Sequence, residues 1–269
     1  MIDEINGKGE IFLLEIFPIY MTSSKQDRLI RVYLPKNYNE GSKKYPVLYM
    51  HDGQNVFNDD DAIGGTSLEL ENYLDENGLD VIVVGIDQHP KDRINEYCPW
   101  VNGEYCKKIL GHASTSGGKG IEYVDFIVNE LKPFIDNKYR TLKDNTAMAG
   151  ISLGGLITIY AMCRYPQVFK NIAVLSSAFY RNQEQIEKLI KETDLSLIER
   201  IYLDCGDKES GNEEFINKEV LNSNKAIYDI LKEKVTSLEF AIISDAEHNY
   251  SFFRERVPKI FSFLSNNLN

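Results

Sequence analysis

A G-x-S-x-G pattern lies at Gly150-Ile151-Ser152-Leu153-Gly154, between two apolar segments. The preceding segment, 145–149, is typical of a buried strand, and the following segment, 155–164, is typical of a helix packed on a sheet. In this setting the pattern predicts a sharp turn that exposes a strained nucleophilic serine, with glycines where side chains would collide. The alternative is an ordinary glycine and serine turn, because the pattern alone arises by chance in many chains.

Strand and helix patterns alternate along most of the chain. The segments with strand character are 10–17, 28–34, 46–50, 80–86, 145–149, 171–175, 200–205 and 238–243. The segments with helical spacing are 67–76, 120–139 with an interruption at Pro133, 155–164, 183–191, 213–232 and 250–264. The alternation predicts an α/β fold: a mostly parallel central sheet with helices on both faces, behind an antiparallel N-terminal strand pair. One domain is expected over residues 1–269, with a long loop at 87–119.

The composition is typical of a globular protein that is soluble, with 43% hydrophobic and 26% charged residues. The formal net charge of -11 argues against nucleic acid or an anionic membrane surface as a partner. The chain begins without a signal-peptide pattern, and no segment approaches the length of a transmembrane helix. Four cysteines without C-x-x-C spacing favour free thiols. A cytoplasmic location is therefore expected.

The catalytic base can be chosen by elimination. A nucleophile elbow is followed in the chain by an acid and then by a histidine. Of the four histidines, only His248 follows Ser152. It lies just past the strand expected at 238–243, where a loop can carry the imidazole over the serine. A plain surface histidine is the alternative.

The acid is expected in the loop after the strand at 200–205, which offers Asp204, Asp207 and Glu209. Glu209 is favoured because it lies farther into the loop and has the longer side chain. Asp207 is expected to cap the turn and to face solvent. Asp204 still belongs to the strand, so the sheet determines its direction.

Two backbone N–H groups are needed to stabilise the oxyanion of an acyl-transfer reaction. The first is expected from Leu153, and the second from the loop after the third strand, at Gly53 or Gln54. No metal site is predicted, since the acidic residues of 51–61 meet no ligand spacing. The glycine-rich segment 116–120 lacks the features of a phosphate-binding loop.

Aromatic residues lie where a substrate would bind, near the carboxyl ends of the strands. Tyr97, Trp100 and Tyr105 belong to the connection 87–119, and Phe179 and Tyr180 follow the strand at 171–175. They are expected either to line a substrate pocket or simply to anchor the long loop. The segment 176–200 is too short for a large hydrophobic lid, which favours soluble esters over lipid interfaces.

Several motifs resemble the esterase family of α/β-hydrolases that includes esterase D, feruloyl esterases and enterochelin-type siderophore esterases. They are RVYLP at 31–35, YPVLYMHDGQNVF at 45–57, EYCPW at 96–100, ELKPFID at 130–136, AGISLGG at 149–155 and HN at 248–249. The resemblance implies an α/β-hydrolase fold and hydrolysis of carboxylic esters through an acyl-serine, without metal or cofactor. It also implies that the acid belongs to a Gly-x-x-Asp/Glu motif, which Gly206 and Glu209 match.

The leading hypothesis is a serine carboxylesterase for small or medium soluble esters, with a small-molecule ester as its partner. A siderophore trilactone hydrolase, a feruloyl or acetyl-sugar esterase and an acyltransferase use the same chemistry. A non-catalytic binding protein that retains the hydrolase fold is an alternative of a different class. The complete set of serine, acid and histidine argues against it.

Overall fold

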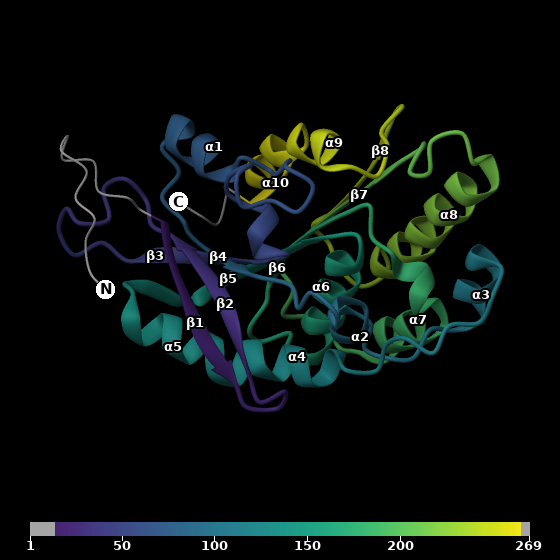
Figure 1. The fold of residues 1–269 in the computed structure, drawn as a ribbon, viewed down its shortest axis with the longest axis horizontal. Helices are drawn as coiled ribbons and strands as arrows, with labels where there is room; N and C mark the ends of the chain where they lie inside the picture. The colour runs from purple at the N-terminus through teal and green to yellow at the C-terminus, as the bar shows by residue number, and fades with distance from the viewer. Residues whose placement is uncertain (1–13, 265–269) are drawn as a thin grey trace.

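The computed structural model describes residues 14–264, and its centre is a mixed sheet of eight strands within that range. The strands are β1 (Leu14–Met21), β2 (Gln26–Tyr33), β3 (Tyr45–His51), β4 (Ile82–Ile86), β5 (Thr141–Ile151), β6 (Asn171–Leu175), β7 (Arg200–Gly206) and β8 (Leu238–Ile243). Their order is β1-β2-β4-β3-β5-β6-β7-β8 (Figure 1). Only β2 pairs antiparallel to its neighbours, β1 and β4, and the remaining pairs are parallel. The expected mostly parallel sheet with an antiparallel N-terminal pair is thus confirmed.

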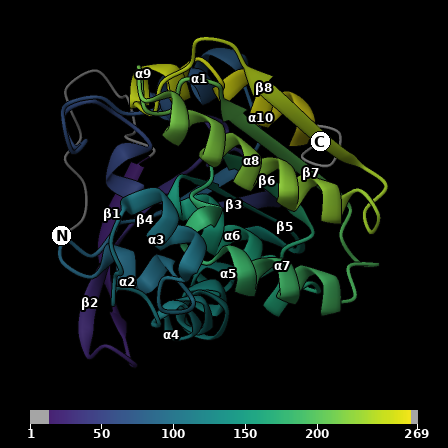
Figure 2. The same ribbon diagram turned by 90° about the vertical axis from the view of Figure 1, so that its right-hand side faces the viewer.

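Helices cover both faces of the sheet. They are α1 (Leu70–Asn77), α2 (Arg93–Tyr97), α3 (Glu104–Leu110), α4 (Gly120–Phe126), α5 (Lys132–Lys138), α6 (Leu153–Arg164), α7 (Gln183–Glu192), α8 (Glu214–Leu231), α9 (Tyr250–Arg254) and α10 (Val257–Leu264). One face packs apolar residues of α4, α5, α6, α7 and α8 into a large core, and the other packs those of α1, α9 and α10. Figures 1 and 2 show the sheet between these two layers. No helix of the described range is long and apolar enough to cross a membrane.

Most strands and helices lie where the sequence predicts them, and the first strand continues farther than expected. It was expected at 10–17 and, within the described residues, runs from Leu14 to Met21; residues 10–13 of that expectation lie outside the described part. The expected interruption at Pro133 is present: a wide helical turn, Ile127–Leu131, separates α4 from α5. Proline has no backbone N–H to donate, so the regular hydrogen-bond pattern cannot continue through it.

Two expectations are wrong. The connection 87–119 is not a plain loop, because it contains α2 and α3 and is held by a bridge between Val101 and Gly117. Its apolar side chains explain the difference, since Tyr97, Cys98 and Cys106 are fully buried. The closing helix expected at 250–264 is two helices, α9 and α10, because Pro258 cannot donate the hydrogen bond that would join them.

Candidate active site

Ser152 occupies the sharp turn between β5 and α6. Its backbone has φ 60° and ψ -121°, a strained conformation for a residue with a side chain. A Cβ atom added to Gly150 would overlap the carbonyl oxygen of Gly154, and one added to Gly155 would overlap the Ser177 hydroxyl. The glycines of the motif are therefore required by contact, and the turn places Ser152 at the carboxyl edge of the sheet.

Glu209 and His248 meet beside this edge. His248 follows β8, Glu209 follows the end of β7, and the distance between Glu209 Oε2 and His248 Nδ1 is 2.5 Å. Glu209 Oε1 accepts hydrogen bonds of 2.5 Å from the Ser176 hydroxyl and from the backbone N–H of Gly206. Burial alone would raise the pKa of the Glu209 carboxyl, but the hydrogen bonds from His248, Ser176 and Gly206 outweigh it and lower the pKa. The carboxylate is thus ionised and can stabilise a positively charged imidazole.

The other two candidate acids have different contacts. Asp207 Oδ1 accepts a hydrogen bond of 2.7 Å from the backbone N–H of Asp245, so this carboxylate caps a neighbouring loop. Asp204 is fully buried and forms an ion pair of 3.0 Å with Arg256. Burial raises the pKa of Asp204 to about 6, against the opposing charge of Arg256. Neither carboxylate contacts His248 within the described residues, so geometry favours Glu209 as the partner of the imidazole.

Ser176 forms a hydrogen bond with Glu209, and Arg256 forms one with Ser176. Neither residue was predicted from the sequence. Arg256 Nη1 donates to the Ser176 hydroxyl at 2.8 Å and to Asp204, and the Ser176 hydroxyl in turn donates to Glu209. Ser176 has φ 46°, which directs the chain away from β6 directly after the strand ends. The sequence did contain a signal for each residue. Ser176 is a polar residue at the carboxyl end of β6, the strand next to β5, and Arg256 is a charged residue between two apolar helices.

The order of the strands brings these groups together. The Ser152 N–H donates to the Leu175 carbonyl at 3.0 Å, and the Ala178 N–H donates to the Ser152 carbonyl at 2.9 Å. Ser176 therefore lies directly beside the Ser152 turn, and Glu209 lies just after the end of the next strand, β7. His248 keeps 36% of its side chain exposed. No hydrogen bond joins it to the Ser152 hydroxyl within the described range.

The loop after β3 lies against the other side of Ser152. A Cβ atom added to Gly154 would lie 3.3 Å from His51 Cβ and 3.6 Å from Asp52 Oδ2, so this loop touches the first turn of α6. Residues Gly53–Asn55 form a short helical turn. Gln54 is held there, because its side-chain oxygen accepts the backbone N–H of Gln88 at 3.0 Å. The loop that carries the expected donors Gly53 and Gln54 thus lies next to the first turn of α6, which begins at Leu153.

The aromatic residues expected to line a pocket divide into two groups. Tyr97 and Phe179 are fully buried, so they are core residues and cannot form the wall of an open pocket. Trp100 and Tyr180 are partly exposed, and Trp100 packs edge-on against Tyr160 with ring centroids 5.3 Å apart. Tyr105 is also half-buried and donates its hydroxyl to the Glu219 carbonyl at 3.4 Å. For Tyr97 and Phe179, the anchoring interpretation is the one that fits.

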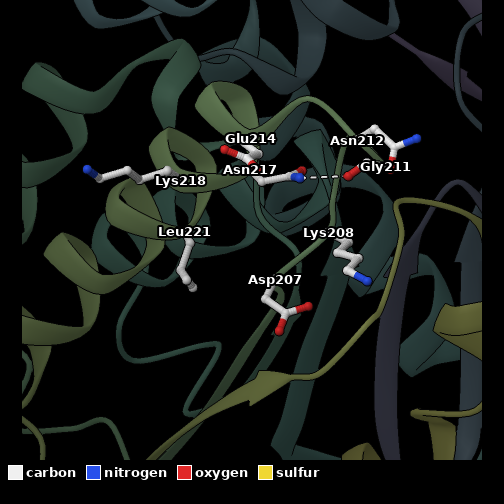
Figure 3. A pocket seen from close by; sticks show the side chains of 8 residues that line it. All are labelled: Asp207, Lys208, Gly211, Asn212, Glu214, Asn217, Lys218 and Leu221. Atoms are coloured by element: carbon white, nitrogen blue, oxygen red, sulfur yellow. Dashed lines mark hydrogen bonds between the residues drawn. The ribbon is translucent and has the colours of Figure 1, made fainter.

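A polar hollow of about 390 Å³ lies beside the Glu209 loop, between residues 207–212 and the first half of α8. Figure 3 shows Asp207 and Lys208 on one side and Asn217, Lys218 and Leu221 on the other. None of the expected pocket aromatics lines it. Among the described residues, no group of three potential ligands could hold a metal ion.

Comparison with known proteins identifies the family of this chain. A family model described as "Putative esterase" matches residues 22–264. The chain belongs to this esterase family. It is 26% identical to the uncharacterized protein YbbA of Bacillus subtilis strain 168 over 245 residues, which cover 88% of this chain and 92% of that relative.

Solved structures show the same fold. The IroE-like serine hydrolase from Shewanella oneidensis superposes with a TM-score of 0.72 at 18% identity, covering 95% of this chain and 88% of that one. The siderophore hydrolase EstA from Aspergillus nidulans superposes with a TM-score of 0.75 at 18% identity, covering 99% and 98%. The α/β-hydrolase fold and the family resemblance expected from the sequence are confirmed.

We expect Gly150→Ala to destabilise the protein by about 1–3 kcal/mol, because the new methyl group meets the rigid carbonyl of Gly154. The measurement is urea-induced unfolding followed by circular dichroism. Gly103→Ala is the matched control, since the methyl group there meets side-chain atoms, chiefly the carboxylate of Glu184, which can shift more easily than backbone. Equal unfolding midpoints for the two variants would contradict the contact argument.

We expect Asp204→Asn to lower the free energy of unfolding by about 3–5 kcal/mol, because it leaves the charge of Arg256 buried and unpaired. Urea unfolding measures the loss. Asp229→Asn removes a carboxylate from an exposed pair with Lys232 and should leave the midpoint unchanged. A wild-type midpoint for Asp204→Asn would show that the ion pair contributes nothing.

Proposed function

We propose that this protein is a serine carboxylesterase that uses Ser152, His248 and Glu209 as its catalytic triad. The observation that carries the proposal is the 2.5 Å hydrogen bond between Glu209 and His248, in an esterase-family chain with a strained serine turn. With its Nδ1 proton donated to Glu209, the imidazole presents the unprotonated Nε2 as a base.

The reaction follows from these roles. The Ser152 oxygen attacks the ester carbonyl while His248 Nε2 takes the hydroxyl proton, and Glu209 stabilises the imidazolium that forms. The carbonyl oxygen becomes an oxyanion, which the N–H groups of Leu153 and of Gly53 or Gln54 stabilise. The C–O bond to the alcohol then breaks, and His248 returns the proton to the departing alkoxide. Water hydrolyses the acyl-serine by the same steps, which release the acid and restore Ser152.

We propose small or medium soluble esters as substrates. The segment between β6 and β7 is short, and it forms α7 rather than a large apolar lid. The structural similarity to a siderophore hydrolase makes a siderophore trilactone one alternative, with feruloyl or acetyl-sugar esters as others. A panel of p-nitrophenyl esters of graded acyl length, together with aryl and sugar esters, separates these classes. Four free, buried cysteines are consistent with a reducing compartment, so the cytoplasm is our proposed location.

We expect Ser152→Ala to lower p-nitrophenyl acetate hydrolysis by about 10³-fold or more, because only the attacking oxygen is lost. The same variant should no longer react with a fluorophosphonate label, and His248→Gln should abolish turnover as well. His112→Gln, an exposed histidine, is the matched control for the imidazole change. If the protein were non-catalytic, the wild type and all of these variants would be equally unreactive.

We expect Glu209→Gln to reduce kcat far more than Asp207→Asn. The Glu209 carboxylate holds the tautomer of His248 and stabilises its charged form, whereas the Asp207 carboxylate binds only a backbone N–H. Steady-state kinetics on both variants, with unfolding curves to verify the fold, provide the measurement. The reverse order of activities would assign the acid to Asp207.

A further inference from the structure

Asp52 has an unusual backbone conformation at the place where β3 enters the candidate oxyanion loop. Its φ of 57° and ψ of 47° are left-handed, a conformation that few residues with a side chain adopt. Asp52 is also 3% exposed, so water does not hold it in place. The conformation therefore depends on its protein contacts.

Helix α2 supplies those contacts. The Asp52 N–H donates to the Tyr97 hydroxyl at 3.1 Å. The Asp52 carboxylate accepts a bidentate pair from Arg93, at 2.7 Å from Nε and 2.8 Å from Nη2. Arg93 in turn lies over the ring of Tyr97, 5.1 Å from its centroid. Residues of this short helix thus bind both the backbone and the side chain of Asp52.

A buried pair of tyrosines extends these contacts to the preceding residue. The rings of Tyr97 and Tyr123 pack with centroids 5.1 Å apart, and the Tyr123 hydroxyl lies 2.8 Å from His51 Nδ1. Burial, aided by the charge of Arg93, lowers the pKa of His51 to about 3, so its imidazole is neutral and can accept at Nδ1. The Asp52 N–H thus donates to Tyr97, and the Tyr123 hydroxyl donates to the neutral His51.

The position of Asp52 determines where the oxyanion donors lie. The N–H of Asp52 is bound to Tyr97, so the next N–H groups along the loop, of Gly53 and Gln54, are the ones left to face a substrate. Gly53 packs so closely on the backbone of Gly85 that a Cβ atom would not fit, so Gly53 cannot move toward β4. On the other side the loop touches Gly154, two residues after the nucleophile.

We propose that Arg93 and Tyr97 are positioning residues for the oxyanion hole, because they hold Asp52 in the left-handed conformation that aims the following N–H groups at the acyl oxygen. The proposal rests on the esterase function proposed above. Neither residue needs to touch the substrate. Their effect should therefore appear in the transition state and leave ground-state binding unchanged.

The experiment compares Tyr97→Phe and Arg93→Met with two matched controls remote from Ser152. Arg164→Met removes a similar bidentate pair, with Asp125, from an arginine that also lies over a tyrosine ring. Tyr139→Phe removes a similar tyrosine hydroxyl, bound to Glu15. Each protein is assayed for kcat and KM with p-nitrophenyl acetate, and for inhibition by an aryl trifluoromethyl ketone, whose adduct with the serine carries an oxyanion.

We expect Tyr97→Phe to lower kcat about tenfold, the equivalent of one hydrogen bond, and Arg93→Met to lower it by up to about 10²-fold. KM should change by less than about threefold, and the inhibition constant of the ketone should rise as kcat/KM falls. Arg93→Lys retains the charge without the fork and should recover only part of the activity. The two control variants should retain wild-type kinetics.

Three results would overturn the proposal: unchanged kcat in both α2 variants, a rise in KM alone, or an equal loss in the controls. A rise in KM alone would make Arg93 a substrate contact. A third combination separates the two proposals: the wild type hydrolyses the ester, Ser152→Ala abolishes this activity, and the α2 variants behave like the wild type. This result would refute the positioning role of Arg93 and Tyr97 and leave the esterase function intact. Absence of wild-type hydrolysis would remove both.

Discussion

The close approach of β5 to α6 at Ser152 is the constraint on which the site depends. Gly150 faces the carbonyl of Gly154 with no room for a Cβ atom, and this contact forces the serine between them into a positive φ. The strain is tolerable because both elements are fixed by the core: β5 lies between β3 and β6, and nearly all of α6 is buried. The packed core therefore stabilises a strained backbone conformation at Ser152 that a free loop would not keep.

The acid side of the site shows how a buried charge is accommodated. Glu209, Asp204 and Arg256 are all buried, an arrangement that is unfavourable for isolated ions. Ser176 connects them, since its hydroxyl accepts from Arg256 and donates to Glu209. The negative charge that His248 needs is thus stabilised by an extended network of partners. This network also explains why the pKa of Glu209 is lowered despite burial.

The sequence was most informative where local chemistry leaves few options. The glycine pattern predicted the turn at Ser152, elimination identified His248, and loop length favoured the partner that His248 has in the structure, Glu209. Ser176 and Arg256 were missed because they come from separate segments that only the strand order brings together. Tyr97 was expected either to line a pocket or to anchor the long loop, because the sequence does not tell which way an aromatic ring faces. In the fold, Tyr97 is buried in the core and accepts a hydrogen bond from the Asp52 N–H.

Two separately anchored halves meet at Ser152. The proposed acid is held through Arg256, which binds Asp204 and Ser176, and the proposed oxyanion loop is held by Arg93, which binds Asp52. One link between them is a hydrogen bond of 2.9 Å from the Asn55 side chain to the Tyr250 hydroxyl, two residues after His248. Because these two charge networks share no residue, each can hold its own group in place. In the proposed mechanism the remaining partner of Ser152 is the imidazole of His248, which Glu209 orients.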